Sequence, residues 1–230
     1  MKTPNITVLC NCRFPSTAAH STYLARLCES FVNNGANVEL VVPQRFKEIR
    51  QDPLKYYDVK KPFSVKKIWS FDFIIFGKFL GKLAFFLQYA HFYFLVLIYF
   101  LFRSRNRIIY TMDNLGPLLT FLGYKVVFET HIGIGQYRKF LLPLIRRSEK
   151  LVVVNSIIKS EFVKAGFKSE DVLVAPNGVD LSVFSGSESK YDLRRELDLP
   201  SSSKIIAYIG KYKTMGMDKG VDDLVRVLEI

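Results

Sequence analysis

Short runs rich in β-branched residues alternate with helical segments along most of the chain. The first two runs are "ITVLC" (6–10) and "NVELVV" (37–42), and residues 21–35 between them carry apolar residues at helical spacing. Strands this apolar are typical of a parallel sheet that is covered on both faces by its crossover helices. The alternation therefore predicts an α/β domain with a doubly wound parallel sheet. The remaining predicted strands are 107–111, 125–130, 150–155 and 171–176, and the remaining predicted helices are 115–123, 137–147 and 156–166.

Residues 43–70 are basic and Tyr-rich and are expected to be mostly loop, with one strand at 66–71.

A change of composition after Pro176 marks a domain boundary, because a linker rich in Gly, Ser, Asn and Asp follows it. A single βα pair then closes the sequence and cannot build a core of its own. We therefore expect a fragment, or a prematurely ended version, of a longer protein. Its expected parts are an N-terminal Rossmann-like domain (1–176), a linker (177–200) with a helix at 191–199, and the start of a second domain (201–230) with a strand at 204–210 and a helix at 220–230.

The chain is strongly basic. It has 33 Lys and Arg against 21 Asp and Glu, a formal net charge of +12, which suits a nucleic acid, an anionic lipid surface or a phosphorylated small molecule. Helix-turn-helix, ribonucleoprotein and zinc-finger patterns are absent from the sequence, so we expect no nucleic acid partner. A solvated basic face without any such partner is the alternative.

The three cysteines Cys10, Cys12 and Cys28 are too few, and odd in number, for a disulfide framework. This usage favours a reducing compartment, so we expect the protein in the cytoplasm. Cys10 and Cys12 lack the spacing and partners of zinc ligands, and we interpret them as buried or loop thiols. We predict no metal site.

Residues 83–102 form an apolar run without a formal charge, long enough for a helix of roughly 30 Å, about the thickness of a bilayer core. We expect no transmembrane helix here, because the strands before and after it belong to one sheet and both flanks are positive. The run is then either a helix buried all round or one half sunk in the inner leaflet, as a peripheral anchor on anionic lipid. The second is favoured, because the run is longer and more aromatic than core packing requires.

Two motifs follow the predicted sheet in a recognisable order, "VLVAPNGVD" (172–180) and "YIGKYKTMGMDKGVDDLV" (208–225). Together with the doubly wound domain they resemble the nucleotide-sugar glycosyltransferases of the two-domain GT-B fold, specifically glycosyltransferase family 4. The resemblance covers nearly the whole chain. It implies sugar transfer from a nucleotide-sugar co-substrate to a glycan or lipid-linked acceptor, with retention of configuration and with no metal or other cofactor. The sequence also has no D-x-D triplet.

The resemblance assigns the donor diphosphate to Lys211 and Lys219. Two cations there would stabilise the charge that develops on the leaving nucleoside diphosphate. Lys211 stands where the family often has Arg. A lysine there would supply the positive charge but could not form the two parallel hydrogen bonds that an arginine makes to a phosphate. Both could equally be ordinary surface lysines.

The family's Gly-Gly pair in the loop after the first strand falls on Ala18 and Ala19. Alanine does not adopt a positive φ cheaply, so another loop path is expected and a phosphate-cradling role is in doubt. The alternative is simply the N-terminus of the first helix, whose free N–H groups favour a nearby anion.

His131 ends the predicted strand 125–130, where the carboxyl ends of parallel strands line the ligand crevice. Family members often have a His here, so we expect His131 to contact the transferred sugar or the acceptor, with Glu129 or Thr130 shaping the turn. A buried core histidine is the alternative. Asp113 and Asn114 are further pocket candidates by position, or caps of the following helix.

The resemblance also implies a pair of glutamates beyond Ile230, so we expect the chain to be inactive alone. The alternatives are a GT-B sugar epimerase and a non-catalytic membrane-docking or scaffolding module. A dinucleotide oxidoreductase is disfavoured, because neither G-x-G-x-x-G after the first strand nor an acid at the end of the second is present.

Overall fold

The computed structural model describes residues 3–46, 49–137, 139–179, 181, 186, 188–210, 212–214 and 217–227. Its contacts divide the chain into two units, Met1–Asn177 and Gly178–Ile230. Each unit is described by itself.

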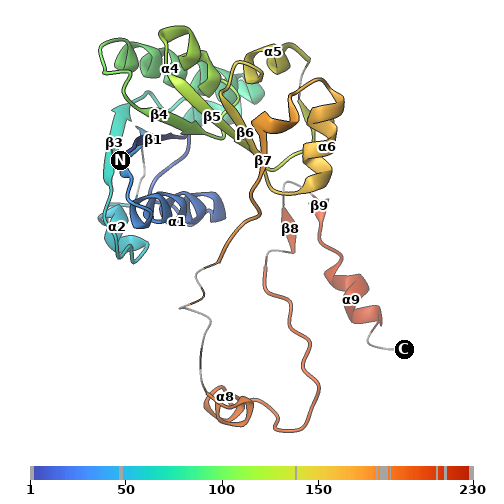
Figure 1. The fold of residues 1–230 in the computed structure, drawn as a ribbon. Helices are drawn as coiled ribbons and strands as arrows, with labels where there is room; N and C mark the ends of the chain where they lie inside the picture. Colours follow the sequence, from blue (N-terminus) through green and yellow to red (C-terminus); the bar gives the residue numbers. More distant parts are fainter. Residues whose placement is uncertain are drawn as a thin grey trace. The chain divides into compact units, whose positions relative to one another are not determined.

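The first unit is built on a seven-stranded sheet with the order β3-β2-β1-β4-β5-β6-β7 (Figure 1). Every neighbouring pair is parallel, which confirms the predicted doubly wound α/β fold. The strand order reverses beside β1, because the chain builds β2 and β3 on one side and returns to build β4 to β7 on the other. The strands are β1 (Asn5–Leu9), β2 (Asn37–Gln44), β3 (Ser64–Trp69), β4 (Ile108–Thr111), β5 (Lys125–Thr130), β6 (Lys150–Val153) and β7 (Val172–Val174).

The helices of this unit depart from the prediction in several places. Residues 43–70 contain α2 as well as the strand β3, which lies two residues earlier than predicted, and η1 and α3 follow without having been predicted. The predicted helix 137–147 forms only short pieces, because Pro143 is tolerated at the start of α5 and not inside a longer helix. The α-helices are α1 (Ala19–Asn33), α2 (Pro53–Tyr56), α3 (Gly77–Leu80), α4 (Lys82–Leu101), α5 (Leu142–Ile145) and α6 (Ser156–Lys164). The 3-10 helices are η1 (Phe73–Phe76), η2 (Gly116–Leu122), η3 (Ile134–Gln136), η4 (Lys139–Leu141) and η5 (Ser169–Asp171).

The side chains of adjacent residues in the central strands point to opposite faces of the sheet, as the strand period of two requires. Val8 and Leu40 pack with α1 residues such as Leu24. Leu9 and Val41 pack on the other face with α4. Gly35 follows the end of α1 at a φ of +84°, a conformation that suits glycine.

One face of α4 is buried and the other is exposed, which excludes the alternative of a helix buried all round. Phe85, Phe86 and Phe94 are 70%, 69% and 62% exposed. Among the described residues, α4 is the one helix whose length and apolar composition would suffice to cross a membrane, a test that core helices of soluble proteins also pass. The buried residues of α4 are Ala84, Gln88, Phe92, Tyr93, Val96 and Phe100.

Two polar residues of α4, Gln88 and His91, bond the segment that follows β3. Gln88 accepts a hydrogen bond from the Phe73 N–H at 2.8 Å and donates to the Ser70 hydroxyl at 3.3 Å. Ser70 Oγ in turn lies 3.2 Å from His91 Nδ1. These bonds tie the start of the helix to the segment that follows β3.

The second unit contains α8 (Lys190–Glu196), the antiparallel pair β8 (Lys213–Thr214) and β9 (Met217–Asp218), and α9 (Val221–Val227). The prediction of a strand at 204–210 is wrong, since this segment is extended chain without strand pairing. Its apolar side chains are exposed, with Ile209 at 96%. An apolar run forms a strand only where a neighbouring strand accepts its hydrogen bonds, and the described part of this unit offers none beside it.

Candidate active site at the carboxyl edge of the sheet

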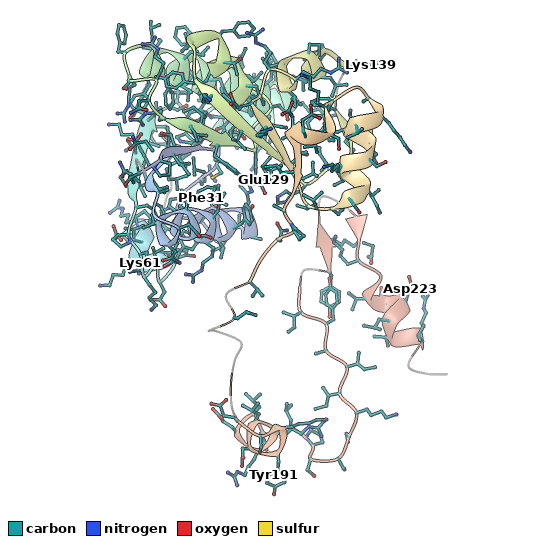
Figure 2. All side chains as sticks on the ribbon, in the orientation of Figure 1. Phe31, Lys61, Glu129, Lys139, Tyr191 and Asp223 are labelled. Atoms are coloured by element: carbon teal, nitrogen blue, oxygen red, sulfur yellow. The ribbon has the colours of Figure 1, made fainter. Side chains whose placement is uncertain are left out.

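The carboxyl ends of β1, β4 and β5 lie beside the reversal of strand order. Doubly wound sheets bind their ligands at this place. Figure 2 shows Glu129 at the end of β5. Titratable side chains from β5, the segment after β1 and the segment after β4 gather along this edge, and α1 adds more from its first turns.

Glu129 is a buried carboxylate that receives two hydrogen bonds. Its side chain is 2% exposed, and Oε1 accepts from the Tyr23 hydroxyl at 2.5 Å and lies 2.7 Å from His131 Nε2. The Tyr23 ring also packs edge-on against the imidazole, with centroids 5.5 Å apart. The carboxylate thereby sets the orientation of His131. With Nε2 donating to Glu129, Nδ1 is the nitrogen left for a ligand.

Asp113 lies half-buried after β4 and is held by groups from two other elements. Its Oδ2 accepts from the Asn11 N–H at 2.5 Å and from the Tyr93 hydroxyl at 2.8 Å. Arg45 donates to the Asn11 side chain. Burial raises the pKa of Asp113 to about 6, although the bonds from Tyr93 and Asn11 and the charge of Arg45 act in the opposite direction. A carboxyl with this pKa can hold or release a proton near neutral pH.

His20 and Cys10 form a contact between the first turn of α1 and the end of β1. His20 Nε2 lies 3.1 Å from Cys10 Sγ. Burial, and then the neighbouring His131, lower the pKa of His20, while Glu129 raises it. All three cysteines are free, Cys10 being buried and Cys12 half-buried.

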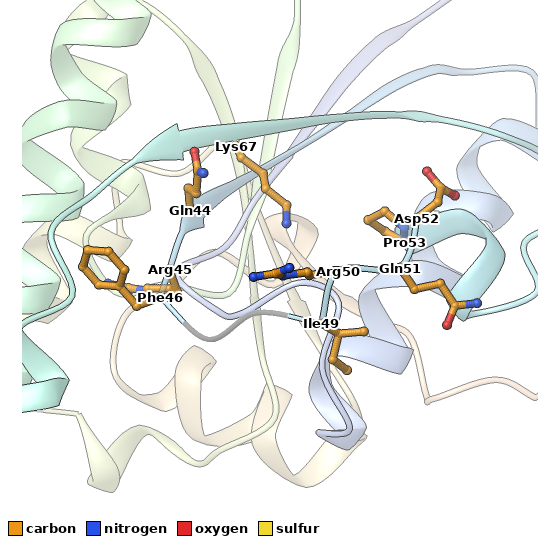
Figure 3. Close-up of a pocket in the computed structure, with 9 residues that line it drawn as sticks. All are labelled: Gln44, Arg45, Phe46, Ile49, Arg50, Gln51, Asp52, Pro53 and Lys67. Carbon is orange, nitrogen blue, oxygen red and sulfur yellow. The ribbon is translucent and has the colours of Figure 1, made fainter.

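A cavity of about 620 Å³ opens beyond β2, beside β3 (Figure 3). Three cationic residues, Arg45, Arg50 and Lys67, line it, and Lys67 and Arg50 point into the same space. The Asp52 side chain accepts from the Lys55 N–H at 2.9 Å and caps α2. Arg45 thus lines this cavity and also bonds Asn11, whose N–H donates to Asp113. The other lining residues are Gln44, Phe46, Ile49, Gln51 and Pro53.

The structure brings His131 and Asp113 to the same edge of the sheet. Asn114 follows Asp113 and is half-buried. Asp113 does not cap the following helix, since η2 has no side-chain cap. His131 is no core histidine, because its side chain is 35% exposed.

The remaining predicted site residues are Ala18, Ala19, Lys211 and Lys219. Ala18 is the N-cap of α1 with a φ of −74°, so the loop takes a path that alanine adopts easily, and Ala19 begins the helix. Lys219 is exposed in the second unit. Lys211 lies outside the described residues, and the diphosphate-binding role of both lysines stays a prediction.

Sequence reasoning missed four residues of this edge: His20, Tyr23, Tyr93 and Arg45. Tyr93 belongs to the apolar run, where nothing in the sequence separates a core tyrosine from one that donates to Asp113. His20 and Tyr23 lie on the first two turns of α1, and the start of a helix after the first strand of a doubly wound fold is a signal that would have found them.

The edge combines an oriented imidazole, a carboxyl of near-neutral pKa and a cation-lined cavity. An imidazole that is held by a buried carboxylate forms a directed hydrogen bond with a sugar hydroxyl or with a charge that develops during reaction. Arg45, Arg50 and Lys67 suit an anionic group of a ligand.

Comparison with known proteins bears on the family and the fold of the chain. Residues 20–183 match the model of Glycosyltransferase Family 4. Among curated proteins, none matches the chain. Solved structures of low sequence identity share its fold.

A glycosyltransferase from Rickettsia africae superposes with a TM-score of 0.60 at 13% identity, over 99% of this chain and 57% of that one. The lipopolysaccharide outer core galactosyltransferase WaaB superposes with a TM-score of 0.52 at 16% identity, over 76% of this chain and 46% of that one. Anabaena HepE in complex with UDP-glucose superposes with a TM-score of 0.51 at 15% identity, over 84% of this chain and 50% of that one. The chain thus spans about half the length of these proteins. By the family model that matches most of its length, and by its Rossmann-like half of a GT-B fold, the chain belongs to glycosyltransferase family 4.

Proposed function

We propose that the chain forms the acceptor-side domain, and the beginning of the donor site, of an enzyme that transfers a sugar from a nucleotide sugar to a glycan or lipid-linked acceptor. Family membership supports glycosyl transfer. The observation that most supports the site is that His131 is exposed at the carboxyl edge of the sheet and is held there by the buried Glu129. A nucleotide-sugar donor is favoured because HepE is seen with UDP-glucose.

In this proposal the residues of the chain bind and orient the donor and the acceptor, and they form no covalent bond with either. His131 donates to or accepts from a hydroxyl of the transferred sugar or acceptor, and Glu129 holds the ring in place. Lys211 and Lys219 stabilise the departing diphosphate. The transfer retains configuration and needs no metal or other cofactor.

A donor screen tests the proposal. The full product of the gene that encodes this chain is incubated with several nucleotide sugars and a chelator, and release of nucleoside diphosphate is measured. Release from at least one donor is expected, and the chain by itself is expected to be inactive. A full product that folds, binds donor and exchanges only the C2 epimers of the sugar would favour the epimerase alternative instead.

We further propose that the exposed face of α4 rests on the inner face of a membrane that contains anionic lipid, which would bring a lipid-linked acceptor to the site. The exposed Lys78 precedes the helix, the exposed Lys82 is its first residue, and the exposed Arg105 follows it, so cations border the apolar face at both ends. A wholly apolar groove of about 360 Å³ continues this face, between the second half of α4 and η2.

Flotation with vesicles tests this dock. Binding is expected with anionic vesicles, and Phe85→Glu with Phe86→Glu should abolish it. Ile157→Glu on α6, where the side chain is 71% exposed, is the matched control and should leave flotation unchanged. Equal flotation of both variants would contradict the dock. Flotation without donor turnover by the full product would favour the scaffolding alternative.

A further inference from the structure

Three side chains with soft donor atoms converge where β1 meets α1. The sulfurs of Cys10 and Cys12 and a ring nitrogen of His20 all lie within 4.8 Å of one another. Cys10 and Cys12 are two positions apart directly after β1, a spacing that places side chains on the same side of an extended chain. His20 reaches the same point from the first turn of α1. The spacing of the cysteines alone did not predict this cluster, because the third member comes from the next element.

The donor set is that of a thiophilic cation. Zinc binds thiolate sulfur at about 2.3 Å and imidazole nitrogen at about 2.0 to 2.1 Å, so tetrahedral ligand atoms lie roughly 3.3 to 3.8 Å apart. His20 Nε2 and Cys10 Sγ are 3.1 Å apart. Small side-chain rotations would therefore bring the three atoms to tetrahedral spacing. As a hydrogen-bonding group the cluster is poor, because a thiol is a weak donor and a weak acceptor.

Binding of such a cation requires both thiols to lose their protons and the imidazole to be neutral. The cation would compensate the two thiolates as they form, and both protons would be released to solvent.

We propose that Cys10, Cys12 and His20 bind a divalent thiophilic cation of the zinc class, with the fourth position taken by water. Such an ion would join the end of β1 to the first turn of α1 and hold the intervening loop, including Ala18, in one conformation. Its role is to position this loop beside the proposed acceptor site, and the sugar transfer itself does not pass through it. The site depends on geometry in the first unit alone and does not rest on the proposed function.

Cobalt titration of the purified, reduced chain tests the site without any activity assay. Co²⁺ should give the intense near-ultraviolet charge-transfer band of thiolate ligation, and Zn²⁺ should remove it. Cys12→Ser, at a half-buried position, and His20→Asn, at an exposed one, should each weaken binding at least about tenfold. Both positions tolerate the change sterically, so the variants should keep the far-ultraviolet spectrum of the folded chain.

Cys28→Ala is the matched control, since Cys28 is a free buried thiol outside the cluster. It should leave the cobalt band and its midpoint unchanged. The proposal is overturned if the wild-type chain gives no band, if Cys12→Ser and His20→Asn bind cobalt like wild type while folded, or if Cys28→Ala abolishes the band.

Discussion

His131 and Glu129, two residues apart at the end of β5, share a 2.7 Å contact between Nε2 and Oε1 although one side chain is 35% exposed and the other 2%. The buried partner cannot reach a ligand, whereas the exposed one can. Glu129 is thus a positioning residue for His131, and Tyr23 adds a second hydrogen bond to the same oxygen at 2.5 Å.

Glu129→Gln should lower the turnover number about tenfold in the full gene product, because the amide holds the imidazole less firmly than the carboxylate does. In a His131→Ala background the same change should have little further effect, since the two residues act as one unit. Steady-state kinetics of the single and double variants measures this. Glu149→Gln, at an exposed carboxylate that pairs with Lys125, is the control, and fully additive losses would contradict the positioning role.

Asp113→Asn should flatten the pH dependence of stability. Burial raises the pKa of the carboxyl from 3.8 to about 6, so between these pH values the folded protein holds a proton that the unfolded chain has released. The free energy of unfolding therefore falls as the pH rises through this window, by up to about 3 kcal/mol in total, and stays lower above it. Urea unfolding across the window, with chelator present, measures the effect. Parallel pH profiles of variant and wild type would show that Asp113 titrates normally.

Two phenylalanines of α4 should behave in opposite ways. Phe92 is 0% exposed and packs against the sheet, so Phe92→Ala should cost about 3 to 5 kcal/mol of unfolding free energy. Phe94 is 62% exposed, so Phe94→Ala should change stability by less than about 0.5 kcal/mol and should weaken vesicle binding. Chemical denaturation and flotation measure the two effects. A large stability loss in Phe94→Ala would mean that this face is covered in the folded protein.

Much of the fold could be predicted from the sequence because parallel strands are apolar along their whole length. The strand at 125–130 has the predicted bounds, and the others differ by a few residues. The strand predicted at 204–210 does not form, because a strand requires backbone hydrogen bonds to a neighbouring strand and apolar content alone is not sufficient. The helix predicted at 137–147 failed because Pro143 limits where a helix can continue.

The candidate site was predictable in part. His131 and Asp113 could be placed because both follow a strand of a doubly wound sheet. Their partners could not, because Tyr23 and Tyr93 meet Glu129 and Asp113 across more than one element. Such contacts depend on how helices settle on the sheet, which a local pattern does not contain. The same holds for the approach of His20 to the cysteines.

The initial rate of sugar transfer by the full gene product, measured with chelator present, tests the central claim most directly when wild type is compared with His131→Ala and His91→Ala. His91, whose Nδ1 lies 3.2 Å from Ser70 Oγ, serves as the control, because the same imidazole is removed at another position. The account predicts a loss of at least about 100-fold for His131→Ala with an unchanged thermal midpoint, and a rate close to wild type for His91→Ala. A folded His131→Ala variant that transfers sugar at the wild-type rate would contradict it.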